Sequence, residues 1–340
     1  MSSIVLELYE KRKISCQPFV SQTHYETIMG SEAYGVSNNN SNVDIYGFTI
    51  PPKEYLFYPQ DAVIGFKDKN LENFEQFQQH HVVSGDREYD LNIFNISKYF
   101  QLCMENNPNM VDSLYTPERC IKHISKIGEL VRSERKIFLH KGSFHKFRGY
   151  AHAQLHKAAE KNYNKIAEIL NKHDILTPPT YEELKSEFLY GVPIDDILEL
   201  RKLYESASKN PSLKRLQSTM KYGWDVKFGY HVIRLSDEAE QILIHGSIDL
   251  ERNKEMMKAV RAGEMSLEDV RRWFQEKEIQ LEKLYHESTA VPYQPDVKKI
   301  KALLLNCIEE FYGSLKILQT EERAIQAIQD VKELLRSSGF

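Results

Sequence analysis

Four residues in the first hundred positions have the types and the order that phosphoryl transfer needs. Gly30 and Ser31 stand side by side; a glycine lets a phosphate approach the backbone closely, and a serine hydroxyl can donate to it. Asp44 and Asp90 follow, and two carboxylates that face the same side can hold Mg²⁺ against those phosphates. We therefore expect a nucleotide and metal site made of these four residues.

The two aspartates need strands that present them to each other. Residues 43–50 alternate apolar and polar side chains and end at a proline pair, which is typical of a strand. Residues 88–96 alternate in the same way, and Asp90 lies on their polar face. We expect adjacent strands with converging carboxylates, and a Gly–Ser turn that opens a helix beside them.

The spacing of apolar residues changes along the chain of 340 residues. It alternates in the first hundred positions and becomes helical beyond about Ser97. This predicts an α+β protein with a small mixed-sheet domain at 1–110 and a mostly helical domain at 111–340. Helices are predicted at 117–132, 149–172, 180–189, 194–208, 225–245, 251–262, 266–287 and 296–336.

Several motifs occur in an order that resembles a known family. A Gly–Ser pair followed by two acidic strands resembles the DNA polymerase β-like nucleotidyltransferase superfamily. The sequence is most similar to the RNA-repair-pathway DNA polymerase β family, with large-phage members as the nearest expected relatives. The matching segments are Ala33-Tyr34-Gly35, Ser41-Asn42-Val43-Asp44-Ile45-Tyr46-Gly47, Tyr89-Asp90-Leu91, and residues 107–114, 147–155 and 227–235.

The resemblance implies that the mixed-sheet domain is a nucleotidyltransferase domain. The implied reaction transfers a nucleoside monophosphate from an NTP to a hydroxyl acceptor, on an RNA or tRNA end or on a protein, with Mg²⁺ or Mn²⁺. Gly30 and Ser31 would hold the β- and γ-phosphates. Asp44 and Asp90 would hold metal, with Asp90 nearest the attacking hydroxyl. RNA repair is the implied setting.

Asn42 departs from the family pattern, in which this position carries the first metal aspartate. An asparagine is neutral and is a weaker Mg²⁺ ligand than a carboxylate. We expect Asn42 to be a weak metal ligand. The alternative is a non-catalytic protein that binds a nucleotide or a partner on a nucleotidyltransferase fold.

Histidines and basic residues supply further candidates. Lys227, His231 and Arg234 fall at i, i+4 and i+7, so they share one helix face and are predicted to bind the nucleotide. A helix face paired with acidic neighbours explains the same spacing. His80 and His81 lack partner ligands at the spacing of known metal motifs, which favours a surface position.

Composition sets the limits of these interpretations. The formal net charge of −4 argues against a broadly basic nucleic-acid coat. The spacing of the 4 cysteines matches neither a zinc site nor a disulfide framework. No stretch approaches about 18 apolar residues and no signal peptide is evident, so we expect no membrane partner and a cytoplasmic protein, in the host cytoplasm for a phage protein.

Overall fold

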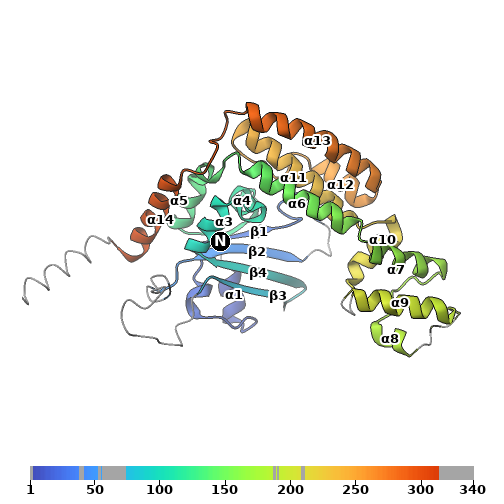
Figure 1. Ribbon diagram of the computed structural model, residues 1–340. Coiled ribbons are helices and arrows are strands. Elements are labelled where there is room, and N and C mark those ends of the chain that lie inside the picture. Colours follow the sequence, from blue (N-terminus) through green and yellow to red (C-terminus); the bar gives the residue numbers. More distant parts are fainter. Residues whose placement is uncertain are drawn as a thin grey trace, which may run out of the picture.

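The computed structural model has the α+β architecture that the sequence predicts (Figure 1). A mixed sheet carries helices on both faces, and a small helical module stands to one side (Figure 1). The structure describes residues 3–37, 42–52, 55, 74–186, 189, 191–207 and 211–313. The end of the predicted helix 296–336 lies outside these residues.

The sheet has five strands in the order β3-β4-β2-β1-β5. They are β1 (Tyr25–Met29), β2 (Val43–Thr49), β3 (Gln76–Ser84), β4 (Arg87–Asn95) and β5 (Ile121–Ile124). β2 and β4 run parallel, and the other neighbours run antiparallel. The two strands predicted around the aspartates are therefore β2 and β4, and they are neighbours within the sheet.

One face of the sheet packs against helix α1 (Ile4–Glu10), which buries Val5 and Leu8 in the core. The buried carboxylate of Glu26 on β1 accepts a hydrogen bond from the Ile4 backbone N–H at 2.9 Å and another from the Ser3 hydroxyl. An anion at a helix N-terminus satisfies its free N–H groups. Glu26 thus fixes α1 to the sheet.

The other face carries the aspartates at one end and aromatic residues at the other. Helices α3 (Ile96–Met104) and α4 (Pro108–Tyr115) cover the aromatic end. The ring centroids of Phe48 and Tyr99 lie 4.9 Å apart, and the Tyr25 hydroxyl donates to the Ser113 carbonyl at 2.6 Å. These two helices do not cover the end of the face that carries the aspartates.

The segment 117–132, predicted as one helix, contains a strand. It folds as a 3-10 turn η2 (Glu118–Cys120), strand β5 and helix α5 (Lys126–Ser133), followed by η3 (Arg135–Phe138). β5 pairs with β1, and the Ser125 side chain then accepts from the Gly128 backbone N–H to begin α5. The prediction was wrong here because the pairing with β1, which is remote in sequence, decides the structure of this short apolar run.

A layer of helices lies over the sheet (Figure 1). α11 (Val226–His245) is its centre and packs against α6 (Ser143–Ala158), α12 (Lys254–Ala262) and α13 (Leu267–Glu287). Because it has neighbours on several sides, α11 buries polar as well as apolar residues. This helix carries the predicted basic face.

Four further helices form a module with a hydrophobic core of its own. They are α7 (Lys161–Lys172), α8 (Tyr181–Lys185), α9 (Ile194–Ser206) and α10 (Leu213–Tyr222), and their shared core includes Ile166, Leu184 and Leu200. Residues 149–172, predicted as one helix, are divided between α6 and α7. We call residues 161–222 the side module.

Helix α14 (Val297–Tyr312) closes the described chain and packs against α3 and α5. None of the helices in the described part of the chain combines the length and the apolar composition that a membrane span requires.

Candidate nucleotide and metal site

Asp44 and Asp90 are direct register partners on β2 and β4. Neighbouring strands lie about 4.8 Å apart, and register partners in a parallel pair point to the same face. The sheet therefore brings the two carboxylates together, on the face and on the neighbouring strands that the alternation of residues predicts.

The two carboxylates differ in how readily they ionise. Burial, and then the negative charge of Asp90, raise the pKa of Asp44 to about 6, against the opposing charge of Lys227. Burial also disfavours the ionised form of Asp90, but hydrogen bonds from the His81 backbone N–H and the Asn42 amide outweigh it, and its pKa lies below the usual range. A cation between the two carboxylates would relieve their repulsion.

Gly30 lies directly against Asp44. Its φ is +68°, in the left-handed region, and a Cβ atom at this position would stand 2.3 Å from the Asp44 Oδ2 atom. A side chain would therefore displace the carboxylate, and the left-handed backbone would be strained as well. Only glycine allows the turn and Asp44 to approach this closely.

We call residues 30–36 the Gly–Ser turn; Gly30 to Gly35 form consecutive turns and not the start of the predicted helix. Val36 N–H donates to the Ser31 carbonyl at 2.9 Å, and Tyr34 N–H donates to the Gly30 carbonyl at 3.2 Å. Ser31 is half-buried within this turn. The turn thus has internal backbone bonds that hold Gly30 and Ser31 at the end of β1.

Arg234 lies behind the Gly–Ser turn and is almost fully buried. Its guanidinium pairs with the carboxylates of Asp112 and Glu238, and it stacks over the Tyr34 ring at 4.5 Å from the centroid. The Tyr34 hydroxyl donates to Asp112 at 3.0 Å. This helix face was predicted either to bind the nucleotide or to pair with acidic neighbours, and the contacts of Arg234 match the second interpretation. The same contacts support the Gly–Ser turn from behind.

Lys227 and His231 lie on the same helix as Arg234 but in different surroundings. Lys227 is exposed, and its charge lowers the pKa of Asp44, so it faces the carboxylate side of the site. Burial, and then the charges of Arg234 and Lys227, hold the pKa of His231 well below its usual range. His231 is therefore a neutral group among cations.

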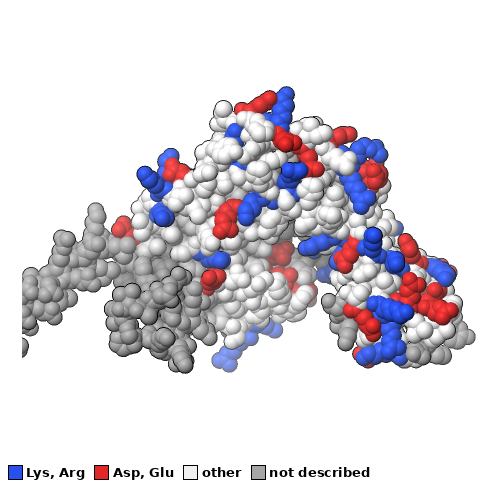
Figure 2. Space-filling view, viewed as in Figure 1, with Lys and Arg blue, Asp and Glu red and all other residues white. Residues whose placement is uncertain are grey.

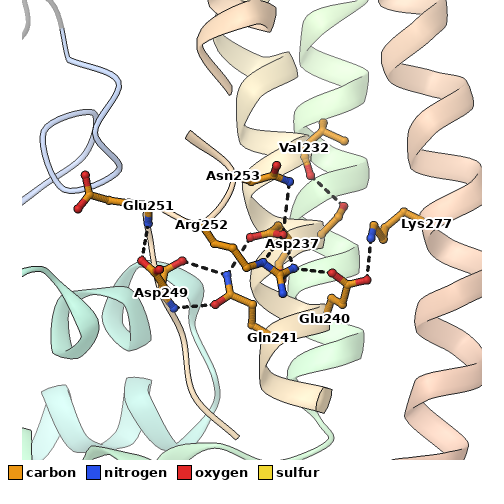
Figure 3. Close-up of polar contacts among 10 residues, drawn as sticks. Val232, Asp237, Glu240, Gln241, Asp249, Glu251, Arg252, Asn253 and Lys277 are labelled. Carbon is orange, nitrogen blue, oxygen red and sulfur yellow. Dashed lines mark hydrogen bonds and ion pairs between the residues drawn. The ribbon is translucent and has the colours of Figure 1, made fainter. Parts of the chain in front are cut away.

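A polar network on α11 anchors the loop that follows it (Figure 3). Arg252 pairs with Asp237 and with Glu240, and Glu240 also accepts from Lys277 at 2.7 Å. The Gln241 side chain accepts from Asp249 N–H at 2.7 Å. Several mutually satisfied polar groups fix this loop in one position.

The anchored loop in turn supports the Gly–Ser turn. Glu251 pairs with Arg119 at 3.0 Å, and Arg119 donates to the Glu32 carbonyl at 2.9 Å. From α12, Arg261 donates to the Val36 carbonyl at 2.6 Å. Arginines from other parts of the chain therefore hold the Glu32 and Val36 carbonyls, which keeps the turn in place before any ligand binds.

Asn42 stands beside Asp90 at the start of β2. Its amide nitrogen donates to Glu88 at 3.2 Å and to Asp90 at 3.4 Å, while its oxygen lies 3.5 Å from the Lys214 ammonium. An amide and a lysine at this position lower the negative charge that divalent ions need. Beside Asp44 and Asp90, Asn42 therefore does not replace a third carboxylate.

Lys214 belongs to the side module, so its contact with Asn42 spans the gap between the module and the sheet. Figure 2 shows a hollow between these two parts of the molecule, with acidic and basic side chains on its walls.

Sequence reasoning missed two neighbours of Asp90. His81 and Glu88 have side-chain ligand atoms that lie, with one from Asp90, within 4.8 Å of one another. The predicted surface position of His81 is confirmed, but the spacing of residues in the sequence did not reveal the two carboxylates beside it. Alternation along β4 places Glu88 on the face of Asp90 and could have signalled it, whereas the bulge between Gln79 and Val82 that brings His81 close has no sequence signature.

The comparison with family models gives one match. A model described as the RNA repair pathway DNA polymerase beta family matches residues 10–261, which include the whole sheet, the Gly–Ser turn and α11. Neither the search of curated proteins nor the search of solved structures finds a match.

Proposed function

The chain belongs to the RNA repair pathway DNA polymerase beta family, and from that premise we propose that it transfers a nucleoside monophosphate from an NTP to a hydroxyl acceptor. RNA, including a tRNA end, is the favoured acceptor, and a protein hydroxyl is the other. The observation that carries the proposal is the register pairing of Asp44 with Asp90 against Gly30. Two paired carboxylates can hold a metal ion, and a glycine turn beside them can hold the triphosphate that the ion binds.

Each residue has a proposed role. Gly30 and Ser31 would hold the β- and γ-phosphates, and Lys227 would neutralise charge on them from α11. Asp44 and Asp90 would hold one divalent ion, Mg²⁺ or Mn²⁺, whose charge would stabilise the phosphates during transfer. Asp90 remains ionised because its pKa is lowered, so it would accept a hydrogen bond from the attacking hydroxyl. Arg234 would keep the turn in position from behind.

The test is nucleotidyl transfer with labelled NTPs. The protein is incubated with each α-labelled NTP, with Mg²⁺ or Mn²⁺, and with total RNA or a protein extract. Label should enter one of the two acceptors, and Asp44→Asn should abolish it. Asp86→Asn is the matched control, because Asp86 is exposed in the turn between β3 and β4. Equal transfer by both variants would place the chemistry elsewhere.

The contacts of Asn42 favour a second candidate. If the amide and Lys214 leave too little negative charge for catalysis, the same site would bind an NTP without transferring it. Calorimetry and the transfer assay together separate the two functions. A binding protein would bind NTP in calorimetry, but it would show no transfer to any acceptor, and Asn42→Asp would not restore transfer.

A further inference from the structure

We propose that His81, Glu88 and Asp90 form a binding site for a divalent transition-metal ion, and that this site binds its ion without a nucleotide. The site lies on the edge of the sheet, between the bulge of β3 and the first half of β4. It shares Asp90 with the proposed nucleotide site but does not depend on nucleotidyl transfer.

The three side chains have the geometry of a ligand set. Their ligand atoms lie within 4.8 Å of one another, and bonds of about 2.0–2.2 Å would bring them within about 4.4 Å. The difference requires only a small side-chain movement. The His81 Nδ1 atom already faces Glu88 Oε1, and an ion between them would replace that contact.

The backbone holds the three residues in this arrangement. Glu88 and Asp90 are two residues apart on β4, so they share a face. The bulge turns His81 towards them, with φ at +58°, and the His81 backbone N–H donates to Asp90 Oδ1 at 2.8 Å. The other oxygen of Asp90 accepts from Asn42. Asp90 is thus oriented from both sides by hydrogen bonds, as metal-ligating carboxylates are.

The ligand types indicate the class of ion. Two carboxylates and an imidazole supply two negative charges and one nitrogen, and a nitrogen ligand favours Mn²⁺, Zn²⁺ and related ions over Mg²⁺. Three protein ligands leave further positions for water or for a substrate oxygen. The His81 side chain is 78% exposed, so an ion can reach the site from solvent.

His80 is the nearest rival for the nitrogen ligand. Its Nδ1 atom lies 3.4 Å from Asp90 Oδ1, but it belongs to no group of three ligands in the described part of the chain. The proposal therefore assigns the nitrogen to His81, and variants of the two histidines distinguish them.

The test uses Mn²⁺ alone, without nucleotide, on the full chain. Titration followed by electron paramagnetic resonance should show a bound ion, and pulsed measurements should show coupling of that ion to one ¹⁴N nucleus. His81→Gln should remove this coupling and weaken Mn²⁺ binding by about tenfold or more. Glu88→Gln should weaken binding while the ¹⁴N coupling remains.

Two controls make the outcome decisive. His245→Gln changes an exposed histidine at the end of α11 and should leave binding and coupling unchanged. Asp44→Asn, which removes the proposed catalytic site, should retain the ¹⁴N-coupled ion, so failure of the proposed function leaves this site intact. Bound Mn²⁺ without ¹⁴N coupling, coupling lost in His80→Gln but not in His81→Gln, or unchanged affinity in His81→Gln would each overturn the proposal.

Discussion

Replacing Arg234 by methionine should destabilise the protein strongly. The Arg234 side chain is 5% exposed, and its partners Asp112 and Glu238 are 0% and 2% exposed. Methionine fills similar space but leaves two buried carboxylates without their cation. Removing one partner from a buried ion pair costs about 3–5 kcal/mol, so we expect the free energy of unfolding to fall by that amount near pH 8.

The loss should depend on pH in a defined direction. Burial already raises the pKa of Asp112 to about 6 with Arg234 present, and it also raises that of Glu238. Without the guanidinium both pKa values rise further, so the folded state takes up protons that the unfolded state has lost. Stability is then retained below the unfolded pKa of about 4 and lost as pH rises through the folded pKa. The deficit should be much smaller near pH 5 than near pH 8.

Urea unfolding of both proteins at these two pH values measures the effect. The matched control is the triple variant Arg234→Met, Asp112→Asn, Glu238→Gln, which removes every charge of the cluster and should recover most of the loss near pH 8. A deficit below about 1 kcal/mol, together with much weaker NTP binding, would refute this account. It would mean that Arg234 contacts the nucleotide.

Three further predictions concern the site itself. Gly30→Ala should lower the free energy of unfolding more than Gly85→Ala. Both glycines have positive φ, but of the two only Gly30 has another atom within 4 Å of where a Cβ would stand. Thermal unfolding of the two variants compares the losses, and equal losses would contradict the contact with Asp44. Asn42→Asp should raise both Mn²⁺ affinity and turnover by adding a carboxylate, as titration and the transfer assay would show; no change in either would mean that charge at this position is not limiting. Lys227→Met should weaken NTP binding about tenfold to a hundredfold in calorimetry, since a charge-assisted phosphate contact contributes about 1.5–3 kcal/mol; unchanged affinity would remove Lys227 from the site.

The alternation of residues predicted the central part of this site well. It placed Asp44 and Asp90 on strands at 43–50 and 88–96, and the structure has β2 at 43–49 and β4 at 87–95. Both strands have one face in the core, so burial imposes a period of two on the sequence. The change to helical spacing likewise predicted the helices that carry the basic face.

Pairings between remote segments could not be predicted in this way. β5 is a strand because it pairs with the edge of β1. The bulge at His81 exists because the register between β3 and β4 shifts between Gln79 and Val82. The spacing of Lys227, His231 and Arg234 placed them on one helix, but the carboxylate of Asp112, which comes from another helix, determines what the Arg234 guanidinium contacts. Long-range packing decided each of these features.

The most direct test of the proposed function follows the two ends of the NTP separately. The protein is given RNA with α-labelled or γ-labelled NTP in parallel, and released pyrophosphate is measured. We expect α-label but no γ-label in the acceptor, pyrophosphate in equal amount, and loss of both products in Asp44→Asn and Asp90→Asn. Label from the γ-phosphate in the acceptor, or transfer that survives both substitutions, would contradict nucleotidyl transfer at the paired aspartates.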